Sequence, residues 1–209
     1  MLGPSAKTAS GVKPGTGSVP VTVLVKHGGN AGGRRQWQLA EEVAVNLAYN
    51  GNPHVVMMAT PRDLEDFARG FSLSEGVLLS AGLIKQITVE PVDGGIMIDV
   101  VTVPRAEVSK QRQARSLEGR TGCGICGMQR LDQVVRNVRP VVAGFALDAD
   151  AVARAFAALP ERQVMNLENR SLHAAAWCSP EGEIKMIRED VGRHTALDKL
   201  IGEIGRAHV

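Results

Sequence analysis

The chain has 209 residues, a net charge of +2 and a hydrophobic fraction of 44%, which suits one large or two small domains and excludes global disorder. Its apolar runs are far shorter than the ~20 residues of a membrane helix, and three cysteines with one CxxC are not the pattern of a disulfide framework. We therefore expect a cytoplasmic protein without a membrane partner.

The composition changes along the chain, and the changes divide it into five segments. The predicted segments are a disordered basic tail (1–36), an α+β domain (37–115), a glycine-rich CxxC loop (116–130), a second α/β domain (131–202) and a short end (203–209). The tail is expected to be disordered because Gly, Ser, Pro, Thr and Lys dominate it.

Strands are predicted in the first domain from β-rich runs bounded by turn residues. Asn50-Gly51-Asn52 is a good hairpin turn, and Asp93-Gly94-Gly95 joins a second pair of strands. The expected strands cover residues 42–49, 54–59, 86–91 and 96–103.

A helix is expected to follow Thr60-Pro61-Arg62-Asp63. Thr60 would be the N-cap, Pro61 suits the first turn, and Asp63 would reach back as in a capping box. Apolar residues then recur at helical spacing up to Gly76.

The second domain is predicted to contain a helix, a hairpin and another helix. Asp148 or Asp150 would cap the first helix, which continues to residue 158. The strands are expected at residues 172–178 and 184–188, and the last helix at residues 193–202.

The stretch RTGCGICG, residues 120–127, holds Cys123 and Cys126. A cysteine attacks as the thiolate, and a positive surround lowers its pKa. Residues 105–139 contain eight Lys or Arg against three Asp or Glu, and the glycines of the stretch permit unusual backbone angles. These features favour a thiol that attacks another sulfur atom.

Other interpretations of the CxxC stay open from the residues alone. A structural zinc site needs four ligands, so two would have to come from Cys178, His173, His194 or a second subunit. A thioredoxin-like dithiol is also possible, although such motifs usually open a helix after a strand. Cys178 itself lies in a strand pattern after AAAW and is expected to be a buried small hydrophobe.

The motif EDVGRH, residues 189–194, places four ionisable groups at a strand-to-helix junction. One interpretation is structural: Asp190 caps the helix and Gly192 allows the turn. The other is an anion or proton-transfer site built on Arg193 and His194, since a helix start offers free N–H groups and histidine titrates near neutrality. The residues alone favour neither.

Three further ionisable residues are expected to be structural. His173 is interpreted as a satisfied core histidine, and Asp198 and Lys199 as a solvated or capping pair on the last helix.

The chain resembles the FdhD family, the formate dehydrogenase accessory sulfurtransferases, in three motifs taken together: GRTGCGICG, LHAAAW and EDVGRHTALDKLIG. It is also similar to that family's N-terminal domain in the stretch VNLAYNGNPHVVMMATPRDLEDFARGFSLSEGV. The resemblance covers residues 39–202 in the family's order. It implies that the second domain is similar to the cytidine deaminase fold, incomplete in this chain. The deaminase zinc ligands are absent from it, so base deamination is not expected.

The resemblance also implies a reaction. Such proteins accept sulfane sulfur from a cysteine desulfurase as a persulfide, on the residue matching Cys123, with Cys126 assisting. They pass the sulfur to a molybdenum (or tungsten) bis-pyranopterin guanine dinucleotide, an acceptor rather than a tightly bound cofactor, before it enters formate dehydrogenase. Family members are homodimers, and no resident metal or nucleic-acid partner is implied. The alternatives are a zinc-bound interaction module and a non-catalytic chaperone of the cofactor or dehydrogenase.

The family continues past residues 193–202 with further strands and helices, including a segment that contacts the guanine nucleotide. We therefore expect this chain to be a fragment. One permitted codon choice for residues 203–209, GAG ATC GGA AGA GCA CAC GTC, contains the start of a widely used sequencing adapter. These residues are accordingly expected to be non-native. Because the family's nucleotide-contacting segment is absent from the chain, the cofactor contacts are not identified, and Arg193 and His194 are the candidates.

Overall fold

The structure, a computed structural model, describes residues 17–27, 30–104, 106, 108, 144 and 146–207. Its elements are β1 (Ser18–His27), β2 (Asn30–Ala40), β3 (Val43–Tyr49), β4 (Asn52–Ala59), α1 (Leu64–Ser74), η1 (Ala81–Leu83), β5 (Ile84–Val92), β6 (Gly95–Thr102), α2 (Ala149–Arg162), α3 (Val164–Asn169), β7 (His173–Cys178), β8 (Ile184–Asp190) and α4 (Arg193–Ala207).

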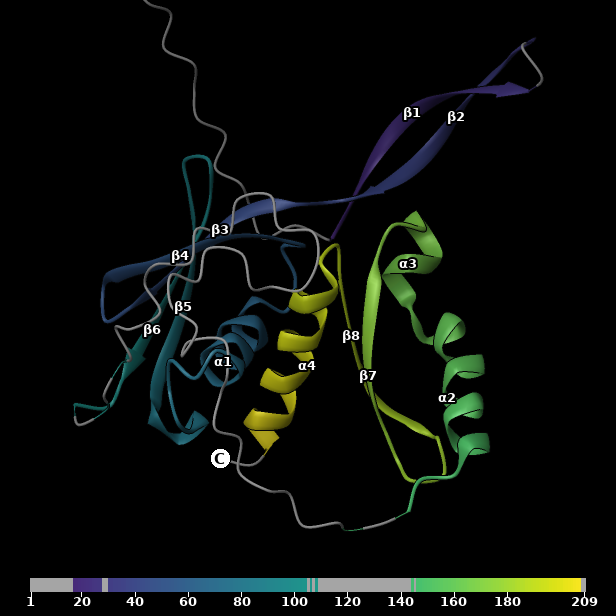
Figure 1. Cartoon of the computed structure of the whole chain (residues 1–209). Helices are drawn as coiled ribbons and strands as arrows, with labels where there is room; N and C mark the ends of the chain where they lie inside the picture. Colours follow the sequence, from purple (N-terminus) through teal and green to yellow (C-terminus); the bar gives the residue numbers. More distant parts are fainter. Residues whose placement is uncertain are drawn as a thin grey trace, which may run out of the picture.

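The elements form successive layers of a mixed α/β protein, the coarse fold class that we expected. Figure 1 shows the four-stranded sheet on one side, α1 and α4 next to each other in the middle, and the β7–β8 hairpin with α2 and α3 on the other side. The β1–β2 hairpin projects from this body as a separate ribbon.

The four-stranded sheet confirms all four strands predicted for the first domain. Its order is β4-β3-β6-β5; β3 and β6 run parallel, and the outer strands pair antiparallel. Alternate side chains of β3 and β6 face α1 and are fully buried, because a pleated strand turns every second residue to the same face. The core centres on Val45, Leu47, Ile96, Ile98, Val100, Phe67 and Ala68.

The start of α1 differs from the prediction. The N-cap position is Asp63, in the left-handed region with φ 53°, and its side chain makes no capping hydrogen bond. Thr60 lies before the helix and is fully buried. Its backbone and side chain bond to residues more than 120 positions away, a use that local spacing does not indicate.

The predicted disorder of residues 1–36 is wrong for the part that the structure describes. β1 and β2 pair antiparallel from Ser18 opposite Ala40 onward, and Gln36 Nε2 donates to Thr22 Oγ1 across the pair at 3.1 Å. The composition concealed an alternating β-branched run, Val19, Val21, Val23, that suits a strand. Residues 1–16 lie outside the described part.

The second unit confirms the predicted hairpin and both predicted helices. The Asp148 side chain accepts from Asp150 N at 3.1 Å and caps α2, as expected. α3 was not predicted, and α4 continues to Ala207, beyond the expected residue 202. The structure does not test the expectation that residues 203–209 are non-native. Residues 109–143, which include the CxxC loop, lie outside the described residues.

Two glycines allow α1 and α4 to cross at backbone contact. A Cβ atom on Gly70 would collide with the carbonyl oxygen of Asp198, and one on Gly202 with the carbonyl oxygen of Asp66. Any side chain at either position would force the helices apart. The two units are therefore joined through a close backbone contact in the middle of the molecule.

None of the helices in the described ranges is both long and apolar enough to span a membrane.

Candidate functional site

The turn between β8 and α4 is held by Asp190, which is completely buried. Its Oδ1 accepts from Gly192 N at 2.7 Å, so the residue is structural, but this bond holds the turn before α4 and not an N–H of the helix itself. Its Oδ2 accepts from Thr60 N at 3.0 Å and lies 2.6 Å from Lys199 Nζ. The carboxylate thus ties the turn both to α4 and to the end of β4.

Lys199 is the cation of this cluster, and the expectation that it belongs to a solvated pair is wrong. Its side chain has no exposed surface and donates to the Thr60 carbonyl oxygen at 3.0 Å. Burial lowers the pKa of Lys199, and the facing Asp190 carboxylate opposes that shift. Thr60 completes the arrangement because its Oγ1 accepts from Val191 N at 3.1 Å. We call Thr60, Asp190 and Lys199 the interdomain clasp.

The other acid of the motif, Glu189, is also structural. Its Oε2 and Oε1 accept from Met165 N and Asn166 N at 2.9 Å each, at the start of α3. A carboxylate there satisfies N–H groups that a helix start leaves without partners. Both acids of EDVGRH therefore hold the backbone in place, so Arg193 and His194 are the residues of the motif that can contact a ligand.

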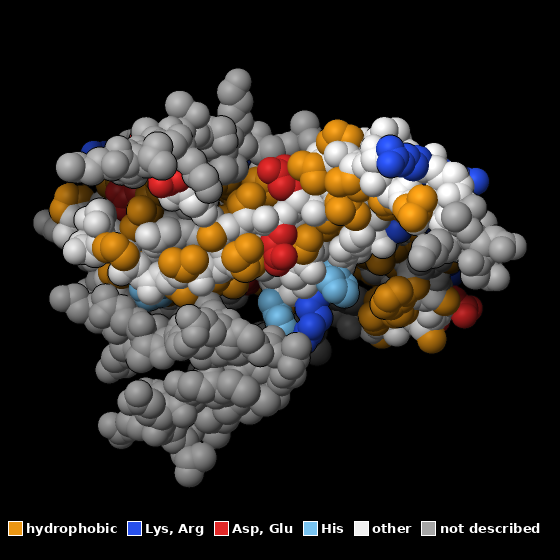
Figure 2. Space-filling model, turned by 90° about the horizontal axis from the view of Figure 1, so that it is seen from above, with side chains coloured by type: hydrophobic (Ala, Val, Ile, Leu, Met, Phe, Trp, Pro, Cys, Tyr) orange, Lys and Arg blue, Asp and Glu red, His pale blue; other side chains and the backbone are white. Residues whose placement is uncertain are grey.

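Arg193 and His194 begin α4 and are both exposed. His173 is also exposed, so the expectation of a core histidine is wrong; it pairs in register with Asp190 at the same end of the β7–β8 hairpin. Figure 2 shows histidine and Lys or Arg side chains gathered beside one another near the centre of that view. We call His173, Arg193 and His194 the cationic corner.

The cationic corner has the chemistry to bind an anion. Arginine supplies a fixed fork of donors that fits phosphate or carboxylate oxygens, and each histidine ring adds an N–H donor. The clasp adjoins the corner, since Asp190 and Lys199 bracket Arg193 and His194 along the chain and Asp190 pairs with His173 in the β7–β8 hairpin. The corner is thus mounted on a buried, fully bonded base.

A second set of polar contacts links α4 and β8 to α1. Arg188 Nη2 lies 2.7 Å from Asp66 Oδ2, and Ser74 Oγ donates to Asp198 Oδ1 at 2.7 Å. Asp198 is largely buried, so the solvated interpretation is wrong for it too. Burial raises its pKa to about 6, the Ser74 hydrogen bond opposes the shift, and the charge of Glu75 adds to it.

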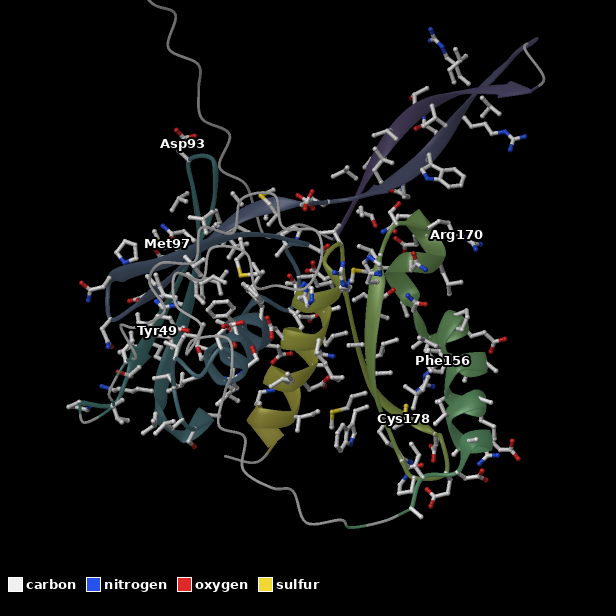
Figure 3. The ribbon with its side chains drawn as sticks, in the orientation of Figure 1. Tyr49, Asp93, Met97, Phe156, Arg170 and Cys178 are labelled. Atoms are coloured by element: carbon white, nitrogen blue, oxygen red, sulfur yellow. The ribbon has the colours of Figure 1, made fainter. Side chains whose placement is uncertain are left out.

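Cys123, the predicted sulfur carrier, and Cys126, its predicted assistant, both lie outside the described residues. Cys178 is a half-buried free thiol. Figure 3 shows it on β7, far along the hairpin from Arg170. Arg170 lies three residues before His173, so Cys178 and the cationic corner are at opposite ends of the hairpin. In the ranges that the structure covers, no group of three or more His, Cys, Asp or Glu is placed to hold a metal ion.

Sequence reasoning misassigned both Thr60, as a helix N-cap, and Lys199, as part of a solvated pair. A signal existed for Lys199: it falls at helical spacing with Thr195, Ala196 and Leu200, all of them buried on one face of α4. Nothing local indicates that Thr60 would bond across the interface.

Known proteins with similar sequences and structures identify the family of this chain. The sequence model of the FdhD/NarQ family matches residues 40–209. The chain belongs to the FdhD/NarQ family. The sulfur carrier protein FdhD of Xanthomonas euvesicatoria pv. vesicatoria is 41% identical over 210 residues, which cover all of this chain and 72% of that protein. The FdhD protein of Variovorax paradoxus is 46% identical over 175 residues, 84% of this chain and 63% of that protein.

A solved structure supports the fold of this FdhD-family chain. The crystal structure described as a formate dehydrogenase accessory protein from Desulfotalea psychrophila aligns with a TM-score of 0.69 at 21% identity, covering 92% of this chain and 71% of that one. At this identity the likeness concerns the fold alone. The FdhD membership itself rests on the sequence, and it confirms the resemblance carried by the CxxC and EDVGRH motifs.

Proposed function

We propose that this chain is a sulfur carrier that accepts sulfane sulfur from a cysteine desulfurase as a persulfide on Cys123. It delivers the sulfur to a molybdenum bis-pyranopterin guanine dinucleotide used by formate dehydrogenase. The observation that carries the proposal is the identity of about 41% along the entire chain with sulfur carrier proteins, together with a CxxC in a basic segment.

The transfer step balances without an added oxidant. The Cys123 thiolate attacks the outer sulfur of the donor's persulfide, a new S–S bond forms on Cys123, and the donor cysteine leaves as a thiolate. Delivery is a second transfer, in which the acceptor supplies the electron pair for a bond to the outer sulfur, the S–S bond breaks, and its electron pair restores the Cys123 thiolate. Cys126 is proposed to assist by resolving an undelivered persulfide: its thiolate attacks the Cys123 sulfur, a Cys123–Cys126 disulfide forms, and the outer sulfur leaves as hydrosulfide.

The cationic corner supports the second half of the proposal. The acceptor carries phosphate groups, and Arg193 with His194 presents exposed donors on a base that the clasp holds rigidly. We propose that these two residues contact the phosphates. We also propose that α2–α4 with β7 and β8 form a relative of the cytidine deaminase fold, and that the protein is a cytoplasmic homodimer.

Mass spectrometry after incubation with a desulfurase and cysteine tests the proposal. Cys123 is expected to gain the mass of one sulfur atom, Cys123→Ala to lose the adduct, and Cys178→Ala to keep it. Equal loading of the Cys123→Ala protein would overturn the assignment. Stoichiometric zinc that is lost with either Cys123 or Cys126 would instead favour an interaction module, and cofactor binding without sulfur transfer would favour a chaperone.

A further inference from the structure

The β1–β2 ribbon has one apolar face. Because paired residues of an antiparallel ribbon lie on the same side, the register sorts the side chains into two faces. The apolar face consists of the pairs Val19–Leu39, Val21–Trp37 and Val23–Arg35. The opposite face carries the pairs Pro20–Gln38, Thr22–Gln36 and Leu24–Arg34.

The apolar face is partly exposed because the ribbon projects from the body (Figure 1), with Val21 and Val23 half-buried. Trp37 and Leu39 keep 43% of their surface, and Val19 keeps 38%. The ribbon is anchored at its base, where Asn169 Nδ2 of α3 donates to Ser18 Oγ at 2.9 Å. A two-stranded ribbon is only marginally stable in water, and an exposed apolar stripe with a tryptophan marks an interaction surface.

The charge of the ribbon indicates the kind of partner. Residues 17–40 contain Lys26, Arg34 and Arg35 and no Asp or Glu. Within the apolar face the charged residue is Arg35, next to Trp37 on the same strand, and arginine and tryptophan are the residues that most often carry the energy of protein interfaces. A partner surface that is apolar in the centre and acidic at the rim complements this face.

We propose that the apolar face of the ribbon docks the protein that donates sulfur, through an acidic surface of that protein. This inference rests on the proposed function, in which the donor is a protein and the acceptor is a small cofactor. A pocket can hold a cofactor, whereas a ribbon with strands of 10 and 11 residues offers the extended surface that a protein partner needs. The ribbon precedes the family match, which starts at residue 40, the last residue of β2.

Persulfide loading from two donors tests the inference. The first donor is the cysteine desulfurase of the source organism with cysteine, and the second is glutathione persulfide, which needs no docking surface. Arg35→Glu and Trp37→Ser are expected to lower kcat/KM for loading by the desulfurase about tenfold each and to leave the rate with glutathione persulfide unchanged. Arg34→Glu is the matched control, because it makes the same charge change on the opposite face of the same strand.

The outcomes separate the inference from the proposed function. The docking inference is overturned if the desulfurase loads the wild type and both face variants equally well. If, in addition, the face variants differ from the wild type in oligomeric mass, the face is assigned to contact with a second copy of the chain. Residues 41–104, with nine acids against three bases, would then supply the acidic surface. If Arg34→Glu and Arg35→Glu lower kcat/KM for loading by the desulfurase equally, the assignment of docking to one face is overturned. Failure of the wild type to load from either donor contradicts the proposed function itself.

Discussion

Lys199 Nζ lies 2.6 Å from Asp190 Oδ2, and neither side chain has any exposed surface. The pair sits where the end of β4 meets the turn before α4, and Thr60 bonds to both members. A buried ion pair adds little stability relative to an apolar pair, but removal of one partner leaves a buried charge uncompensated. The clasp is therefore expected to specify how the two units meet.

Lys199→Met is expected to destabilise the chain by about 3–5 kcal/mol, because Asp190 stays buried without its cation. Urea unfolding followed by circular dichroism measures the change. Lys185→Met is the matched control: Lys185 is about half exposed and its pair with Glu183 lies at the surface, so the cost should stay within about 0.5 kcal/mol. Similar costs for both variants would refute the role of the clasp.

Gly70→Ala is expected to cost about 3 kcal/mol or more, because the new methyl group collides with the backbone of α4 rather than with a movable side chain. Gly82→Ala is the control, since a Cβ there meets only the Ser80 hydroxyl oxygen at 3.6 Å, an ordinary contact. Thermal unfolding of the two variants measures the difference. A Gly70→Ala protein as stable as the Gly82→Ala protein would show that the helices do not cross at this residue.

The raised pKa of Asp198 is expected to make the free energy of unfolding depend on pH. Its folded pKa of about 6 exceeds the ordinary value of 3.8, so the folded state binds more protons than the unfolded state between these values. Stability contributed by this group is present at low pH and is lost as the pH rises through about 6. Between pH 4 and pH 7, the wild type should lose about 2–3 kcal/mol more than Asp198→Asn, in which the amide oxygen still accepts from Ser74. Parallel stability curves from denaturant titrations would contradict this.

Arg193→Ala is expected to leave persulfide loading on Cys123 unchanged and to lower sulfur delivery about tenfold, because the exposed guanidinium is proposed to contact the acceptor's phosphates. Loading is measured by mass spectrometry, and delivery by activation of formate dehydrogenase. Lys85→Ala removes an exposed cation on β5 and should change neither. Loss of loading and delivery together in Arg193→Ala would assign the residue a structural role.

The sequence alone determined most of the secondary structure and the family. Turn residues such as Asn50-Gly51-Asn52 and alternating strands are local signals, so the strands of the first domain appeared where they were predicted. The ribbon was missed because its glycine- and serine-rich surroundings outweighed the alternation of Val19, Val21 and Val23. The CxxC and EDVGRH motifs identified the FdhD family because they are specific in combination.

Only the tertiary structure decided what the individual charges do. Asp190, Asp198 and Lys199 have the sequence pattern of a capped, solvated helix, yet all three are mostly or completely buried against α1 and β4. Whether such a charge is solvated depends on a partner more than 100 residues away, such as Thr60, and no local pattern encodes that distance. Arg193 and His194 remain exposed at the start of α4, whereas Thr195 and Ala196, which follow them, are buried with Lys199.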